Sequence, residues 1–182
     1  MNYVEPIRDK SIVKEIGEYL KQEKGLKWYV MYSIGIYSGL RVSDILKLKI
    51  RDVKGKKEIK IREQKTGKEK IFPVNSTLEK ILKAYCEGKK AWDYLIPSTR
   101  KTGQSVSREY AYRVIHEAGL EFGLEHLGTH TMRKTFGYHF YLQTKDIVLL
   151  MRILNHNDQS KTLRYIGIEQ TTINEAMRKF KY

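Results

Sequence analysis

The spacing of the apolar residues changes once along this chain, in the stretch EIKIREQKTGKEKIFPV at residues 58–74. Apolar side chains alternate there on both sides of a break at Thr66-Gly67, at Ile59, Ile61, Ile71 and Val74. Alternation around a short glycine-containing break predicts a β-hairpin. The preceding stretch IRDVKG, residues 50–55, is expected to supply a third short strand.

Elsewhere the apolar residues recur at helical spacing. Helices are predicted at residues 8–23, 27–38, from about 41, and at 76–86, 105–118, 130–143, 145–154 and 172–181. The expected fold class is therefore mainly α with a small three-stranded antiparallel β-sheet (α+β). The length of 182 residues suits one ordinary domain, and no domain boundary is expected within it.

The charge balance points to a polyanionic partner. Lys and Arg number 35 against 21 Asp and Glu, a formal net charge of +14. Such a surplus favours nucleic acid first and an anionic membrane second, with a merely basic soluble protein as the third alternative. Neither a basic amphipathic helix nor a lipidation signal stands out, which disfavours the membrane.

Several classes of protein are disfavoured by what the chain contains. The apolar stretch WYVMYSIGIY is too short to span a bilayer, and the N-terminal residues do not resemble a signal peptide. Cys86 is the single cysteine, which excludes an intramolecular disulfide and a cysteine-based metal site. A cytoplasmic protein without a cofactor is the simplest expectation, because the histidines and carboxylates also lack metal-ligand spacing.

Two clusters in the first half of the chain contain a basic residue that is a candidate for the functional site. In SGLRVSDIL, Arg41 and Asp44 are three residues apart and share a helical face; an ordinary surface ion pair is the alternative. In REQKTGKEK, Lys65 lies at the hairpin tip near Lys68 and Lys70; a solvated basic turn is the alternative. The fragment TGK is not a phosphate-binding P-loop, because the earlier glycine and the following Ser/Thr are missing.

A third cluster, HTMRKTFGYHFY, begins a predicted helix. His130 and Arg133 are again three residues apart, and Thr129 is a plausible N-cap. A helix N-terminus favours an anion, although a structural role for His130 is equally open. His139, farther along, is expected to be structural. The last cluster, ILNHNDQSKTLRYIG, places His156 and Tyr165 nine residues apart across a polar turn.

Taken in order, these clusters resemble the tyrosine recombinase (phage integrase) family. SGLRVSD, HTMRKTF and LNHNDQSKTLRYI are similar to three of its signature boxes, and the resemblance runs from about Val4 to Tyr182. It implies a site-specific recombinase or integrase that cuts and rejoins double-stranded DNA through a 3′-phosphotyrosine. The alternatives are a type IB topoisomerase-like enzyme with the same chemistry, and a non-catalytic DNA-binding relative.

The resemblance also implies roles for individual residues. The nucleophile is Tyr165, the general acid for the leaving 5′ oxygen is Lys65, and Arg41 and Arg133 hold the non-bridging phosphate oxygens. His130 and His156 bond the phosphate and assist proton movement, and Asp44 orients Arg41 or His130. Lys68 and Lys70 are expected to contact DNA. No metal is implied, since the arginines supply the positive charge.

The chain departs from the family pattern in places. The third signature box usually reads Leu-Gly-His, and here Asn155 replaces its glycine; asparagine also tolerates a left-handed backbone. Met132 replaces a common leucine. The helical domain that usually precedes the catalytic domain is expected to be absent, leaving residues 1–182 as one catalytic domain. The amphipathic helix at 172–182 is expected to pack either on a neighbouring subunit, during self-association on DNA, or on its own domain.

Overall fold

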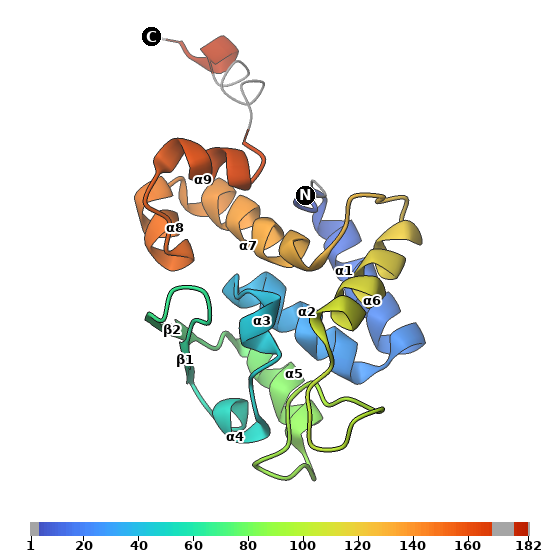
Figure 1. Ribbon diagram of the computed structural model, residues 1–182. Coiled ribbons are helices and arrows are strands. Elements are labelled where there is room, and N and C mark those ends of the chain that lie inside the picture. Colours follow the sequence, from blue (N-terminus) through green and yellow to red (C-terminus); the bar gives the residue numbers. More distant parts are fainter. Residues whose placement is uncertain (1–3, 169–176, 182) are drawn as a thin grey trace.

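A long buried helix, α2 (Leu26–Ser38), lies at the centre of the molecule, as the sequence predicted. The computed structural model describes residues 4–168 and 177–181. The remaining elements are α1 (Lys10–Tyr19) with its π-helical extension η1 (Leu20–Lys24), α3 (Val42–Ile45), α4 (Ile50–Val53), β1 (Glu58–Arg62), β2 (Glu69–Pro73), α5 (Ser76–Cys86), α6 (Arg108–Leu120), α7 (Thr129–Thr144), α8 (Ile147–Leu154) and α9 (Gln159–Tyr165). The fold is mainly helical, as expected (Figure 1).

Helix α7 packs closely against α2 because a glycine on α2 faces it. A Cβ on Gly35 would lie 2.8 Å from the side chain of Met132, closer than real Cβ contacts. The C-terminal end of α2 is a left-handed glycine, Gly39 at φ 63°, and a Cβ there would lie 2.5 Å from the ring of Phe136. These two glycines therefore set the distance between the first and the third sequence clusters.

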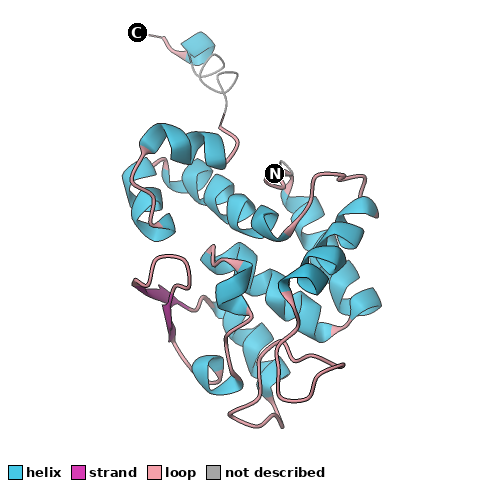
Figure 2. Cartoon of the chain, in the orientation of Figure 1, coloured by secondary structure: helices cyan, strands magenta, loops and turns pink. Residues whose placement is uncertain are grey.

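In the described part of the chain the sheet has two strands, and the prediction of a third strand is wrong (Figure 2). β1 and β2 pair antiparallel, with Ile59 opposite Phe72 and Ile61 opposite Lys70. The stretch expected to form the third strand is instead the one-turn helix α4, in which Ile50 and Val53 are both buried. A spacing of three residues between these apolar side chains is helical and not the alternation of a strand.

A second apolar cluster lies beneath the C-terminal helices. Leu150 and Leu154 of α8 pack with Ile166 and Ile168, which follow α9, and with aromatic residues of α7. Figure 1 shows α8 and α9 folded back beside the C-terminal half of α7. This cluster holds the end of α9, and thus Tyr165, next to α7.

Two expectations concern the ends of the chain and membranes. The helix expected at residues 172–182 falls largely outside the described residues. Among residues 4–168 and 177–181, the helices are all too short or too polar to cross a bilayer.

Candidate active site

Arg133 lies at the point where three parts of the chain meet. Its side chain is buried, and its guanidinium donates from Nη1 to the carbonyl oxygen of Gly39 at 2.5 Å and from Nη2 to that of Leu154 at 2.6 Å. These carbonyls stand at the C-terminal ends of α2 and α8, where helices leave acceptors unpaired. The charge of Arg133 also acts on the Tyr165 phenol and favours its ionised form. One buried cation thus connects the first, third and fourth sequence clusters.

Tyr165 is the last residue of α9, and its ring contacts a lysine and a histidine. The Nζ of Lys134 lies 5.2 Å from the ring centroid, and the ring of His156 meets it edge-on with centroids 5.1 Å apart. Burial raises the pKa of the Tyr165 phenol, while the positive charges of Arg133 and Arg41 act in the opposite direction. The site therefore holds a neutral phenol against the charges that favour its ionised form.

His156 follows directly after α8, in a tight left-handed turn. Asn155 has φ 52° and ψ 46°, so this asparagine adopts the left-handed backbone that it was expected to tolerate. The Nδ1 of His156 contacts the hydroxyl of Thr162 at 3.1 Å. Burial, with the charges of Arg133 and Arg41, lowers the pKa of His156 to about 4. The imidazole is therefore neutral at pH 7.

His130 occupies the first turn of α7. Partial removal from water, followed by the charges of Arg133 and Arg41, lowers its pKa. The expected N-cap Thr129 is wrong: the cap is Gly128, whose N–H donates to the hydroxyl of Thr131 at 3.1 Å. His139 is placed as expected for a structural histidine, with Nε2 at 2.9 Å from the carbonyl oxygen of Ile7.

The carboxylate in contact with Arg41 is that of Glu63, which sequence reasoning missed. Nη1 of Arg41 lies 2.9 Å from Oε1 of Glu63, whose side chain is fully buried. Asp44, expected to orient Arg41 or His130, instead accepts a hydrogen bond from the backbone N–H of Gln64 at 2.9 Å. The sequence did carry a signal, since Glu63 shares the inward face of the hairpin with Ile59 and Ile61.

The hairpin lysines separate into exposed and buried side chains. Lys65 and Lys68 are exposed at its tip. Lys70, expected to contact DNA, is 7% exposed and donates to the carbonyl oxygen of Ser38 at 3.4 Å. Burial, and then the charge of Arg133, lowers the pKa of Lys70 to about 8. The prediction that Ile71 belongs to the inward face of the hairpin is wrong, because Ile71 is 49% exposed while Lys70 and Phe72 point inward.

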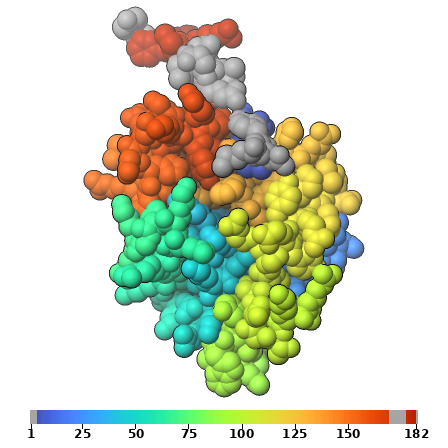
Figure 3. Space-filling model, viewed as in Figure 1, coloured from blue at the N-terminus to red at the C-terminus, as the bar shows by residue number. Residues whose placement is uncertain are grey.

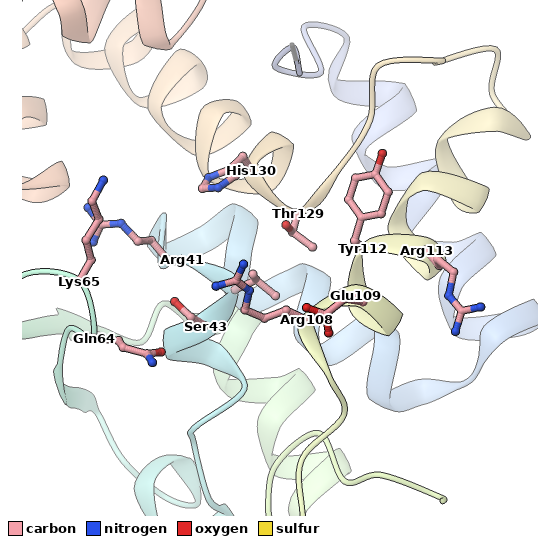
Figure 4. A pocket seen from close by; sticks show the side chains of 11 residues that line it. Arg41, Ser43, Gln64, Lys65, Arg108, Glu109, Tyr112, Arg113, Thr129 and His130 are labelled. Carbon is pink, nitrogen blue, oxygen red and sulfur yellow. The ribbon is translucent and has the colours of Figure 1, made fainter. Parts of the chain in front are cut away.

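A groove of about 720 Å³ opens beside Arg41, Lys65 and His130. Arg41, Lys65 and His130 line one end of it, Tyr112 and Arg113 of α6 line the other, and the side chain of Arg108 lies between them (Figure 4). The space-filling view shows the hairpin, α6 and the α8–α9 region gathered around the segment that carries Arg41 (Figure 3). His156 and Tyr165 do not line this groove; they line a separate pocket of about 310 Å³.

The structure brings five of the six expected catalytic side chains together. The sixth, Lys65, lies at their edge. The charges of Arg41, Lys65 and Arg133 lower the pKa of both His130 and His156, so one positive region surrounds the two histidines. Such a region can bind a phosphate and stabilise additional negative charge on it. Within the described residues, no group of three His, Cys, Asp or Glu side chains is placed to hold a metal ion.

Known proteins resemble this chain in sequence. A sequence model of the phage integrase family matches residues 9–171. YoeC of Bacillus subtilis, a probable integrase/recombinase, is 43% identical over 180 residues, covering 99% of this chain and 98% of that protein. A tyrosine recombinase of Pseudothermotoga lettingae is 28% identical, and the chain spans only 66% of that relative.

Solved structures resemble it in fold. The XerA recombinase superposes with a TM-score of 0.77 at 22% identity, covering 99% of this chain and 68% of that one. XerH, in a post-cleavage complex with its palindromic difH substrate, gives a TM-score of 0.74 at 18% identity, covering 98% of this chain and 54% of that one.

Proposed function

The chain belongs to the phage integrase family, and from this premise we propose that it is a site-specific DNA recombinase. It cleaves one strand of double-stranded DNA and joins the 3′ phosphate of the cut strand to Tyr165. It then transfers that strand to a new 5′ hydroxyl. The observation that carries the proposal is the position of the Tyr165 phenol within the influence of the Arg133 and Arg41 charges, beside His156.

The arginines hold the phosphate in this proposal. An arginine bonds phosphate at two points and stays charged at any physiological pH, so it suits the non-bridging oxygens. Arg133 is fixed by its two carbonyl bonds, and Arg41 by Glu63. Because both are held before DNA arrives, little reorganisation is needed as negative charge develops on phosphorus.

Cleavage requires one proton to leave the phenol and one to reach the leaving group. The Tyr165 oxygen attacks phosphorus, and its proton passes to a neutral histidine, His130 or His156. The bond from phosphorus to the 5′ oxygen breaks, and Lys65 gives that oxygen a proton. The products are a 3′-phosphotyrosine and a free 5′ hydroxyl. Strand joining is the reverse reaction with a different 5′ hydroxyl, so no external energy source is consumed.

DNA is the proposed partner, and the groove is its proposed seat. Cations from the hairpin and from α6 line both ends of the groove, as phosphate binding requires. The complex of XerH with difH supports the same assignment, since the two folds match. Self-association on DNA belongs to the proposal as well, because exchange between two duplexes requires more than one active site.

A nicked suicide substrate tests the function. The duplex is first located by footprinting DNA that flanks the gene, and a nick near the cut lets the 5′ fragment diffuse away. Wild type is expected to accumulate a covalent DNA adduct, and Tyr165→Phe is expected to bind DNA equally but form none. An adduct with Tyr165→Phe would refute the assigned nucleophile. Binding without any adduct from wild type would identify a non-catalytic DNA-binding relative, and relaxation of supercoiled plasmid without exchange would identify a topoisomerase-like enzyme.

A further inference from the structure

The buried carboxylate of Glu63 joins three segments of the site. Its Oε1 forms the ion pair with Arg41, and its Oε2 accepts two hydrogen bonds, from the Thr66 hydroxyl at 2.8 Å and from Nδ2 of Asn155 at 2.9 Å. Although burial alone raises the pKa of Glu63, these hydrogen bonds and the Arg41 charge bring it below its usual value. The group is therefore ionised, and charged acceptors form the stronger hydrogen bonds.

The hairpin tip around Lys65 is anchored on both sides. Before it, the N–H of Gln64 is bound to Asp44 at 2.9 Å. After it, the Thr66 hydroxyl is bound to Glu63, and the N–H of Gly67 donates to the Glu63 carbonyl oxygen at 2.9 Å. Only a short length of backbone separates these anchors, so the Lys65 side chain projects from a fixed turn.

Asn155 contributes something beyond its backbone conformation. Glycine would satisfy φ 52° at least as well, since it lacks a Cβ. The asparagine amide adds the bond to Glu63, and this bond ties the turn before His156 to the hairpin that carries Lys65. The Glu63 carboxylate therefore binds both the hairpin turn, through Thr66, and the turn before His156, through Asn155.

We infer that Glu63 is a positioning residue that, through Thr66 and Asn155, sets Lys65 for proton donation to the leaving oxygen. The inference rests on the proposed function, and it assigns neither Glu63 nor Asn155 any contact with DNA. Loss of either hydrogen bond loosens the hairpin relative to the His156 turn. The step that suffers is protonation of the leaving group, because Lys65 then spends less time within reach of the 5′ oxygen.

A change of leaving atom isolates that step. In a substrate with sulfur in place of the bridging 5′ oxygen, the leaving group is a thiolate, which needs no general acid because thiols ionise at a pKa of about 8.5. Thr66→Val and Asn155→Gly, which keep size or backbone conformation, are expected to slow cleavage of the oxygen substrate about tenfold. Both are expected to cleave the sulfur substrate within about twofold of wild type, as Lys65→Ala should.

Controls keep the outcomes distinct. Thr66→Ser retains the hydroxyl and should cleave both substrates like wild type. Variants that cleave the oxygen substrate at the wild-type rate, or that are equally slow on both substrates, would overturn the inference while leaving the recombinase function intact. If wild type forms no adduct on either substrate and Tyr165→Phe behaves identically, the proposed function itself fails, and this inference with it.

Discussion

The Nδ1 atom of His156 lies 3.1 Å from the Thr162 hydroxyl, which itself donates to the carbonyl oxygen of Asp158 at 2.6 Å. A hydroxyl has one hydrogen, and here the carbonyl takes it. His156 is therefore the donor in its contact with Thr162, so the proton of the neutral ring sits on Nδ1. The other nitrogen, Nε2, is left with a lone pair, as a proton acceptor requires.

Thr162→Val should disturb this orientation without disturbing the fold, because Thr162 is fully buried and valine has nearly its shape. The hydroxyl that holds Nδ1 is lost, so the ring is free to rotate or change tautomer. We expect adduct formation on the suicide substrate to slow about tenfold with unchanged DNA affinity. Thr162→Ser, which keeps the hydroxyl, should react like wild type; equal rates for the valine variant would contradict the assigned orientation.

Gly137→Ala should displace the nucleophile. A Cβ at Gly137 on α7 would lie 2.7 Å from Cγ2 of Ile166, the residue after Tyr165, so α9 must move away. A displacement of about 1 Å at a reacting group can cost about a hundredfold in rate, and that is the expected loss in adduct formation. Adding Ile166→Leu, which removes Cγ2, should restore much of the rate; no recovery would mean that the effect does not arise at this contact.

Arg133→Lys should destabilise the whole protein. Lysine has one ammonium in place of the planar fork, so it cannot serve the carbonyl oxygens of Gly39 and Leu154 together. A buried acceptor without a partner is costly, and we expect a loss of about 2–3 kcal/mol in the free energy of unfolding, measured with urea. Unfolding at the wild-type urea concentration would show that these bonds contribute little.

Stability should fall as the medium is made mildly acidic. The pKa of His156 is about 4 in the folded protein against about 6.5 in an unfolded chain. Between these values the unfolded state binds more protons, so stability is lost as pH falls through that window, with no penalty above it. The melting temperature should drop from pH 7 to pH 5, and by less in His156→Gln. An equal drop in both would assign the effect to other groups.

Lys68 and Lys70 should differ in how they affect DNA binding. Lys68 is exposed at the hairpin tip, whereas the Lys70 ammonium is buried. Lys68→Met is expected to weaken binding and to reduce the slope of log affinity against log salt by about one. Lys70→Met should leave this slope unchanged, because a buried ammonium releases no counterion from phosphate. A reduced slope for Lys70→Met would require the strand to open when DNA binds.

Much of the fold was predictable because its signals are local. The buried pattern of α2 ended at Gly39, and α5 has the predicted bounds of 76–86. The prediction of a third strand was wrong because Ile50 and Val53 are three residues apart, which is the spacing of a helical turn. That turn is held by a capping interaction: the Asp52 carboxylate accepts the Lys49 N–H at 2.8 Å.

The site was predictable in its residue types but less so in its connections. The ordered clusters drew attention to arginines, histidines and a tyrosine that the structure places in one positively charged region; their catalytic roles remain a prediction. The alternation of the hairpin places Glu63 on its inward face but does not reveal its partners, and Asn155 stands out in the sequence only as a substitute for glycine. Both depend on contacts between segments 92 residues apart, which no local pattern reveals.

The two carbonyl bonds of Arg133 have a consequence for descendants of this chain that no longer cut DNA. An arginine that closes the ends of two helices would be retained by selection for folding alone, long after catalysis was lost. Finding the equivalent of Arg133 in a relative is therefore weak evidence that the relative cleaves DNA. Lys65 is exposed, so selection for folding would not retain it, and such decay would appear there first.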